Sequence, residues 1–152
     1  GTPGELHGIF DATDAIGTVE KNTACGIFGV LTSSRAGTAI PAAEAGEVRE
    51  GPAEILSNVE GEQVQRFSVR IDRVDPDAKG GRNLLLTVTD EALLEKTGGI
   101  VQGMSGSPIV QDGKLVGAVT HVLLDDPQRG YGILAENMLS ASGMMARSAA
   151  SA

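Results

Sequence analysis

The chain has 152 residues and a formal net charge of −8, and its only aromatic residues are three Phe and one Tyr. An acidic chain with so few aromatic side chains offers neither a basic patch nor a stacking platform, which argues against nucleic-acid binding. The single cysteine, Cys25, excludes an internal disulfide bond, and we expect it to be a buried small residue. The only histidines, His7 and His121, give little support for a metal site, so we predict no metal and no cofactor.

The first half of the chain alternates short apolar runs with turn residues, a pattern that predicts strands. Gly26–Leu31 is an apolar run bounded by glycine and by Thr and Ser, and it predicts one strand. Residues 47–59 have β character, but Gly51 and Pro52 interrupt them and indicate a kink or a bulge. Residues 64–74 place apolar side chains on one face and polar ones on the other, as in a half-buried strand.

The next segment continues the β pattern and adds one short helix. Residues 84–89 form a denser apolar run and predict a more buried strand. Residues 90–96 predict a helix of one or two turns, with Thr89 or Asp90 as its N-cap. The Asp-Gly pair at 112–113 stands between two apolar segments and predicts a β-hairpin.

The C-terminal part completes the predicted fold. Asp125, Asp126 and Pro127 predict a turn, residues 130–134 a last short strand, and residues 136–151 a helix that frays. The chain thus contains about seven or eight predicted strands and one terminal helix, which indicates an all-β barrel or sandwich.

The segment from 98 to 108 combines four glycines and two serines in a tight loop between a helix and a strand. A nucleophilic serine needs a sharply turned backbone, amide groups aimed at the developing oxyanion, and small neighbours. Ser105 meets these conditions, and the N–H groups of Gly103 and Ser105 are the predicted oxyanion hole. The alternative that the residues alone leave open is a plain β-turn before a strand.

The sequence around Ser105 reads Gly-x-Ser-Gly-Ser-Pro, which differs from the nucleophile elbow of α/β-hydrolases because a strand follows the serine. It resembles the nucleophile loop of chymotrypsin-fold peptidases. That resemblance makes Val119, Thr120 and His121 a strand that lines the specificity pocket and contacts substrate. It also places Gly99, six residues before the nucleophile, at the base of the pocket, where no acidic side chain attracts Lys or Arg.

Over a longer stretch, the sequence is similar to that of the SpoIVB peptidase family. The residues that carry this resemblance are 97–109, 117–122, 126–127 and 130–132, with further matches at 26–29, 51–56 and 88–90. The resemblance implies that Ser105 is the nucleophile and Asp90 the acidic member of the triad. Asp90 also remains a candidate helix N-cap. The implied domain spans residues 1–139, followed by a C-terminal helix or tail at 140–152.

The triad histidine has no good candidate in this chain. In the family it lies upstream of the segment that matches the first residues here, so we expect His7 to be a surface residue. His121 follows Ser105 and is expected in the substrate groove or packed in its strand. We therefore predict an N-terminally truncated chymotrypsin-like barrel, inactive by itself, whose missing strands leave an open sheet edge. That edge predicts homodimerisation or strand exchange.

The resemblance also implies a biological setting. The family comprises membrane-anchored serine peptidases of endospore-forming bacteria, which act between the two membranes around the forespore. They cleave themselves and a regulatory protein in a sigma-factor pathway. Two alternatives are a non-catalytic β-barrel module that binds a peptide by strand addition along residues 119–122, and a self-assembling structural domain.

Overall fold

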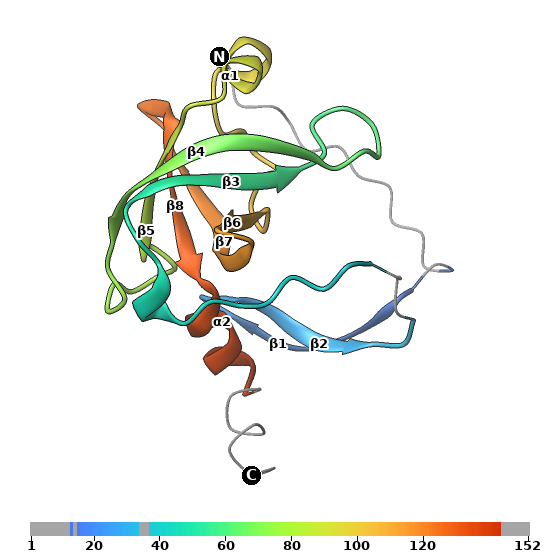
Figure 1. Cartoon of the computed structure of the whole chain (residues 1–152). Coiled ribbons are helices and arrows are strands. Elements are labelled where there is room, and N and C mark those ends of the chain that lie inside the picture. Colours follow the sequence, from blue (N-terminus) through green and yellow to red (C-terminus); the bar gives the residue numbers. More distant parts are fainter. Residues whose placement is uncertain (1–12, 14, 34–36, 144–152) are drawn as a thin grey trace.

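A six-stranded closed barrel dominates the computed structural model, which describes residues 13, 15–33 and 37–143 (Figure 1). The barrel strands are hydrogen-bonded in the order β3-β4-β5-β8-β7-β6, all antiparallel, and β6 closes the barrel on β3. A separate two-stranded sheet pairs β1 with β2. The elements are β1 (Gly17–Thr23), β2 (Gly26–Leu31), the 3-10 helix η1 (Ala45–Glu47), β3 (Gly51–Ser57), β4 (Gln65–Val74), β5 (Leu84–Val88), α1 (Glu91–Thr97), β6 (Pro108–Gln111), β7 (Lys114–Leu123), β8 (Asp126–Leu134) and α2 (Ala135–Ser142).

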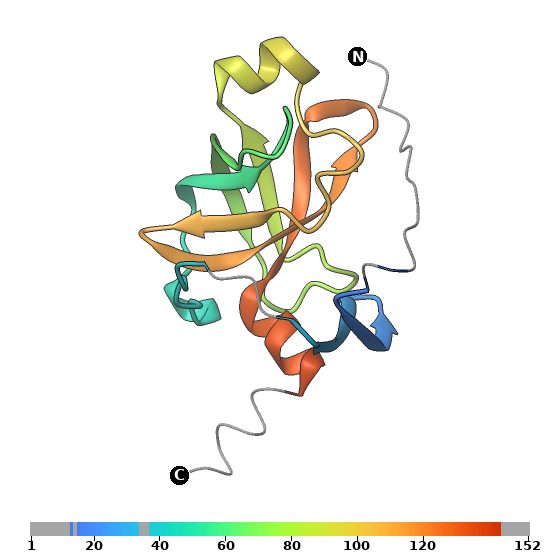
Figure 2. The same ribbon diagram turned by 90° about the vertical axis from the view of Figure 1, so that its right-hand side faces the viewer.

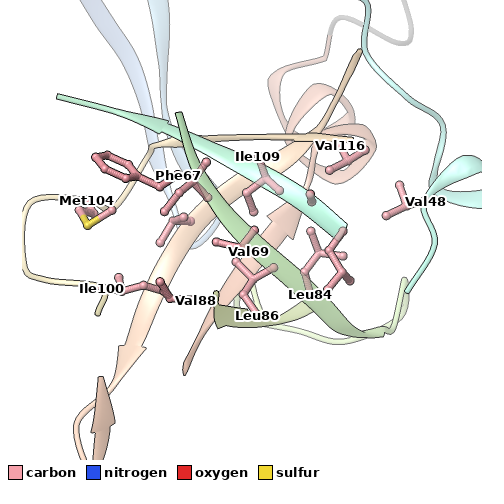
Figure 3. Close-up of a cluster of buried hydrophobic side chains, with 14 of the residues drawn as sticks. Val48, Phe67, Val69, Leu84, Leu86, Val88, Ile100, Met104, Ile109 and Val116 are labelled. Atoms are coloured by element: carbon pink, nitrogen blue, oxygen red, sulfur yellow. The ribbon is translucent and has the colours of Figure 1, made fainter. Parts of the chain in front are cut away.

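The barrel interior holds the hydrophobic core (Figure 3). In β4 the side chains of Phe67, Val69 and Ile71 are buried while the residues between them are exposed or half-buried, which confirms the predicted alternation. In β5, Leu84 and Leu86 are fully buried. Removing such a side chain from water contributes roughly 1.5–3 kcal/mol each, so the alternating strands supply most of the driving force for barrel closure.

Two buried amides tie loops to the barrel. Asn83 donates from Nδ2 to three backbone carbonyls of the β4–β5 turn, and its Oδ1 accepts a hydrogen bond from the amide of Leu134. The Gln111 side chain bonds both the N–H and the C=O of Arg49 and also the carbonyl of Pro52. Because each polar atom has a partner, these hydrogen bonds offset the cost of taking the amides out of water and hold the loops on the barrel.

The predicted fold class is confirmed, with differences at particular boundaries. β8 begins at Asp126 rather than at residue 130, because Leu123 already pairs with Asp126 and only a two-residue turn separates β7 from β8. β3 begins at Gly51, whose positive φ of 134° ends the preceding irregular segment. α2 crosses the expected boundary between 139 and 140, and residues 144–152 lie outside the described part of the chain.

The β1–β2 sheet has an exposed apolar surface. Ile16, Val19, Ile27, Val30 and Leu31 are between 46% and 67% exposed. A lone two-stranded hairpin is marginal in water, so this sheet is a candidate for further pairing. β1 itself has no counterpart among the sequence predictions, because its sequence lacks an apolar run.

Cys25 lies half-buried in the turn between β1 and β2, not in the core, and its backbone N–H bonds the Thr23 hydroxyl. The prediction of a buried cysteine was therefore wrong, because Cys25 stands in the hairpin turn of a sheet whose two strands are themselves largely exposed. None of the helices in the described residues has the length and apolar character to cross a bilayer.

Candidate active site

The loop between α1 and β6 presents Ser105 on a turned backbone. Gly103 and Gly106 flank Met104 and Ser105, with φ values of 101° and 91° that residues with a side chain rarely adopt. Met104 is 3% exposed and points into the core, whereas Ser105 is exposed. The buried Met and the two glycines therefore turn the backbone so that the serine faces outward.

The loop is anchored to β7 immediately after the serine. The amide of Gly106 donates to the carbonyl of Val119 at 2.7 Å, and the amide of Val119 donates to the carbonyl of Ser107 at 2.9 Å. The backbone amides of Gly103 and Ser105 donate to no acceptor among residues 13, 15–33 and 37–143. This geometry leaves both amides available for an oxyanion, the role predicted for them.

Ser105 contacts a β-bulge in β7. Its Oγ donates to the carbonyl oxygen of Thr120 at 3.1 Å. Val119 pairs with Gly132 and His121 with Tyr131, so Thr120 is the extra residue of the bulge. The bulge turns the Thr120 carbonyl toward the serine.

The Thr120 side chain holds this bulge in place, a role that the sequence reasoning missed. Its Oγ1 lies 2.7 Å from the carbonyl oxygen of Gly81 and 3.2 Å from that of Tyr131. Nothing in the spacing of the sequence links Thr120 to Gly81, because the two meet only when β7 packs over the β4–β5 turn. The alternation of side chains along β7 could at most have indicated that the Thr120 hydroxyl points inward.

Asp90 stands at the N-terminus of α1, as the N-cap that the sequence also predicted. One carboxylate oxygen accepts from the amide of Leu93 at 3.0 Å, and the other accepts from the amide of Ser68 at 3.2 Å. In the described part of the chain, no hydrogen bond links Asp90 to Ser105 or to an imidazole. The assignment of Asp90 to the triad stays a prediction.

Neither histidine provides a base in the described structure. His121 is exposed on β7, and its side chain makes no hydrogen bond or ion pair among the described residues. His7 lies outside the described residues. Among the described residues, the carboxyl groups with shifted pKa values are Asp72 and Glu47, and their side-chain hydrogen bonds come from Thr87, Arg70 and Lys114 rather than from Ser105.

The pKa of Asp72 is lowered although its partial burial acts to raise it, because Thr87 and Arg70 donate hydrogen bonds to the carboxylate. A hydrogen bond from Lys114, on β7, lowers the pKa of the exposed Glu47 carboxyl in η1. Among the described residues, no group of three His, Cys, Asp or Glu side chains could hold a metal ion.

Of the residues predicted to contact substrate, Thr120 and His121 are accessible to a peptide, whereas Val119 and Gly99 are buried. Thr120 and His121 lie on a stretch of β7 whose outer side has no partner strand in the described structure. The expectation that Val119 contacts substrate is corrected. Val119 is 1% exposed, and the nucleophile loop already bonds both its N–H and its C=O, so neither group can pair with a peptide. Gly99 is buried, and Ile100 bonds the carbonyl of Pro127 beside it.

The barrel, the Gly-x-Ser-Gly loop and the bulged strand beside it define the nucleophile-bearing barrel of a chymotrypsin-like serine peptidase. Solved structures share the fold: the Rv3671c protease in an inactive form aligns with a TM-score of 0.54 and 20% identity over 84% of this chain and 67% of that chain. The active form of the Rv3671c protease from M. tuberculosis aligns with a TM-score of 0.59 and 18% identity, over 84% of this chain and 57% of that chain. A serine-to-alanine mutant of Rv3671c in an inactive form aligns with a TM-score of 0.55 and 19% identity, over 84% of this chain and 65% of that chain.

The family follows from the sequence as a whole. The family model for SpoIVB peptidase S55 matches residues 1–139, so this chain belongs to the SpoIVB peptidase S55 family and is a serine peptidase domain. A search of curated proteins finds no match. The chain spans about two thirds or less of the solved protease chains that it resembles.

Proposed function

We propose that this chain carries the nucleophile and the oxyanion hole of a serine endopeptidase of the sporulation-signalling type. The observation that carries the proposal is the exposed Ser105, whose own amide and that of Gly103 have no acceptor among the described residues and whose hydroxyl donates to the carbonyl of a bulged strand. In the proposed reaction, Ser105 Oγ bonds to the scissile carbonyl carbon while the amides of Gly103 and Ser105 stabilise the oxyanion. The serine proton passes to a base and then to the leaving amine, and water releases the acyl group.

In the proposed reaction the base comes from outside the described residues. No imidazole contacts Ser105 among the described residues, and the family resemblance assigns the histidine to an upstream segment. Loss of one triad member costs on the order of 10⁴–10⁶ in rate. We propose on this ground that the chain by itself is essentially inactive as a peptidase.

A fluorophosphonate probe tests the proposal directly. Labelling is measured by mass spectrometry on this chain and on a longer protein that includes the upstream segment. The expected result is labelling of Ser105 only in the longer protein, and none after Ser105→Ala. Cleavage of a peptide by the chain alone, lost on Ser105→Ala, would contradict the proposed inactivity.

A non-catalytic peptide-binding module is the second candidate function. The unpartnered side of β7 after Val119 favours it, since an extended peptide can add a strand there. Absence of any probe reaction in the longer protein, together with peptide binding, would support this function over the first.

The substrates and setting follow the family. We propose that the full-length, membrane-anchored protein cleaves itself and a regulatory protein in the space between the two forespore membranes. Mass spectrometry of the protein's new N-termini in sporulating cells tests this, with Ser105→Ala as the control. The proposal predicts fragments that disappear in the variant.

Self-association is a separate part of the proposal. The exposed apolar side chains of the β1–β2 sheet support dimerisation or strand exchange through that sheet. Light scattering coupled to gel filtration should give a dimer mass for this chain, and Val30→Lys should give the monomer mass. Identical masses for both proteins would oppose this route of association.

A further inference from the structure

The inference concerns the residue whose carbonyl Ser105 attacks, called the P1 residue below, and it rests on the proposed peptidase function. We infer that the site accepts peptides with a small uncharged P1 side chain, of about the size of alanine, and that Ile100 sets this limit. Ile100 fills the space between the nucleophile loop and Gly130 of β8, which a larger P1 side chain would need.

The open side of β7 fixes where a peptide lies. β6 pairs with β7 only as far as Ala118, and the nucleophile loop holds Val119. Beyond it, residues 120–123 pair with β8 on one side and with no described segment on the other. An extended peptide that adds a strand there brings one of its carbonyl groups to Ser105, beside the Thr120 carbonyl.

The path of the loop fixes where the P1 side chain must go. After α1, the nucleophile loop first contacts the β7–β8 hairpin at Ile100, whose amide donates to the carbonyl of Pro127 at 2.8 Å. It returns to β7 at Gly106, bonded to Val119. Figure 2 shows this segment passing alongside the hairpin after α1. A P1 side chain next to Ser105 therefore enters between the segment and the hairpin.

Ile100 occupies that space. Its side chain is 3% exposed, and its Cδ1 lies 2.6 Å from the position that a Cβ on Gly130 would take. Gly130 pairs with Val122 of β7, directly across the floor of the hairpin. Figure 3 shows Ile100 beside Val88 at the end of the core, pointing into the barrel. The floor below the P1 side chain is thus closed by a packed isoleucine.

The loop and β7 sides of this space are apolar and uncharged, whereas β8 carries Asp126 and Arg129 before Gly130. Val101 from the loop and Val122 from β7 are half-buried and pack against the same core cluster as Ile100. Residues 98–105 and 118–123 contain no Asp, Glu, Lys or Arg. A long basic side chain would find no ionic partner on these segments, and an aromatic ring would have to displace Ile100.

Peptide binding by the chain itself tests the inference without requiring catalysis. Three product peptides that differ only in their C-terminal residue, Ala, Phe or Arg, are titrated to about 1 mM while backbone amides are followed by NMR. We expect the Ala peptide to bind at least about 10-fold more tightly than the others, the scale by which apolar pockets discriminate. On addition of the Ala peptide, the backbone amide signals of Ser105, Thr120 and Val122 should shift.

Two substitutions locate the limit at Ile100. Ile100→Val removes only Cδ1, the atom that meets Gly130, and should raise the affinity for a peptide ending in Val or Leu several-fold. Ile71→Val is the matched control, since it removes one methyl group from an equally buried isoleucine in β4. Both changes cost about 0.5–1.5 kcal/mol of stability, so a fold that survives one survives the other.

The outcomes separate this inference from the peptidase proposal. Equal or tighter binding of the Phe or Arg peptide, no binding of any peptide, or no change in Ile100→Val overturns the P1 limit. If the Ala peptide is preferred but the longer protein fails to react with fluorophosphonate, the peptidase proposal fails and the binding specificity stands. If the longer protein reacts and cleaves after Phe or Arg, the P1 limit alone fails.

Discussion

The carboxylate of Asp90 accepts a hydrogen bond from the backbone amide of Ser68 at 3.2 Å and so joins the start of α1 to β4. Its other oxygen accepts from the amide of Leu93 and caps the helix. Each carboxylate oxygen has a second lone pair, so the same side chain can cap α1 and still orient an imidazole. The cap and the triad role predicted for Asp90 are therefore separable by experiment.

Replacing Asp90 by asparagine should separate them. An asparagine side chain keeps the oxygen that accepts from Leu93 but places an NH2 group against the Ser68 amide, so Asp90→Asn should lower the free energy of unfolding by about 1 kcal/mol. It cannot stabilise an imidazolium, so activity of the longer, complete protein should fall by roughly 10⁴-fold. The measurements are urea unfolding and kcat. Full activity in the Asp90→Asn protein would assign Asp90 to the cap alone.

The alanine variant is the complement of that experiment. Asp90→Ala removes the oxygen that caps α1 and should lower stability by about 0.5–2 kcal/mol in this chain, whether or not a base is present. Chemical denaturation of the unmodified chain and the variant measures the difference. Equal stability would show that the hydrogen bonds to Leu93 and Ser68 contribute nothing to folding.

Thr120 offers a second test of the site. Thr120→Val keeps the shape of the side chain but removes the hydroxyl that bonds the Gly81 and Tyr131 carbonyls. We expect a loss of about 1–3 kcal/mol, chiefly from the Gly81 carbonyl that then lacks its donor, together with slower probe labelling of Ser105 in the longer protein. Thr18→Val, on exposed β1, is the control for the substitution itself. Unchanged labelling would show that the bulge holds without the hydroxyl.

The predictions that succeeded from sequence rest on local signals. The period-two alternation of residues 64–74 gives the buried face of β4, the Asp-Gly pair gives the β6–β7 hairpin, and Asp90 caps α1 as expected. Each depends on neighbours within a few residues, which fix backbone dihedrals and side-chain direction before any tertiary contact forms.

The features that sequence could not supply depend on contacts between distant segments. The bulge at Thr120 needs Gly81, which is 39 positions away. Occupation of the Val119 backbone by the nucleophile loop needs the barrel to be closed. The early start of β8 at Asp126 follows from pairing with Leu123, which overrides the turn preference of Asp and Pro.

The ion pair at Asp72 predicts an acid dependence of stability. Because the pKa of Asp72 is lowered in the fold by its bonds from Thr87 and Arg70, the folded state favours its ionised form. This stabilisation is present above the ordinary pKa of 3.8 and is lost as pH falls through the lower folded value. Unfolding titrations from pH 6 to about pH 2 should show a shallower decline for Asp72→Asn. An identical decline in Asp77→Asn and Asp72→Asn would count against the assignment.

Asn83 is the position where one substitution should cost most stability outside the core. Its amide bonds three carbonyls of the β4–β5 turn and the amide of Leu134, which starts the connection to α2, and the residue is 1% exposed. Asn83→Ala takes the hydrogen-bond partner from the Ala78 carbonyl and the Leu134 amide, whereas the Asp75 and Pro76 carbonyls still accept from Ala78 and Asn137. At about 1–3 kcal/mol for each group that water cannot reach, we expect a loss of at least about 2 kcal/mol. Asn58→Ala is the matched control, because the exposed Asn58 makes one hydrogen bond, to Gly61, and should change stability by no more than about 0.5 kcal/mol. Urea unfolding of the two variants measures the difference. Similar small losses in both would mean that water replaces the Asn83 amide and that the β4–β5 turn is held by its backbone alone.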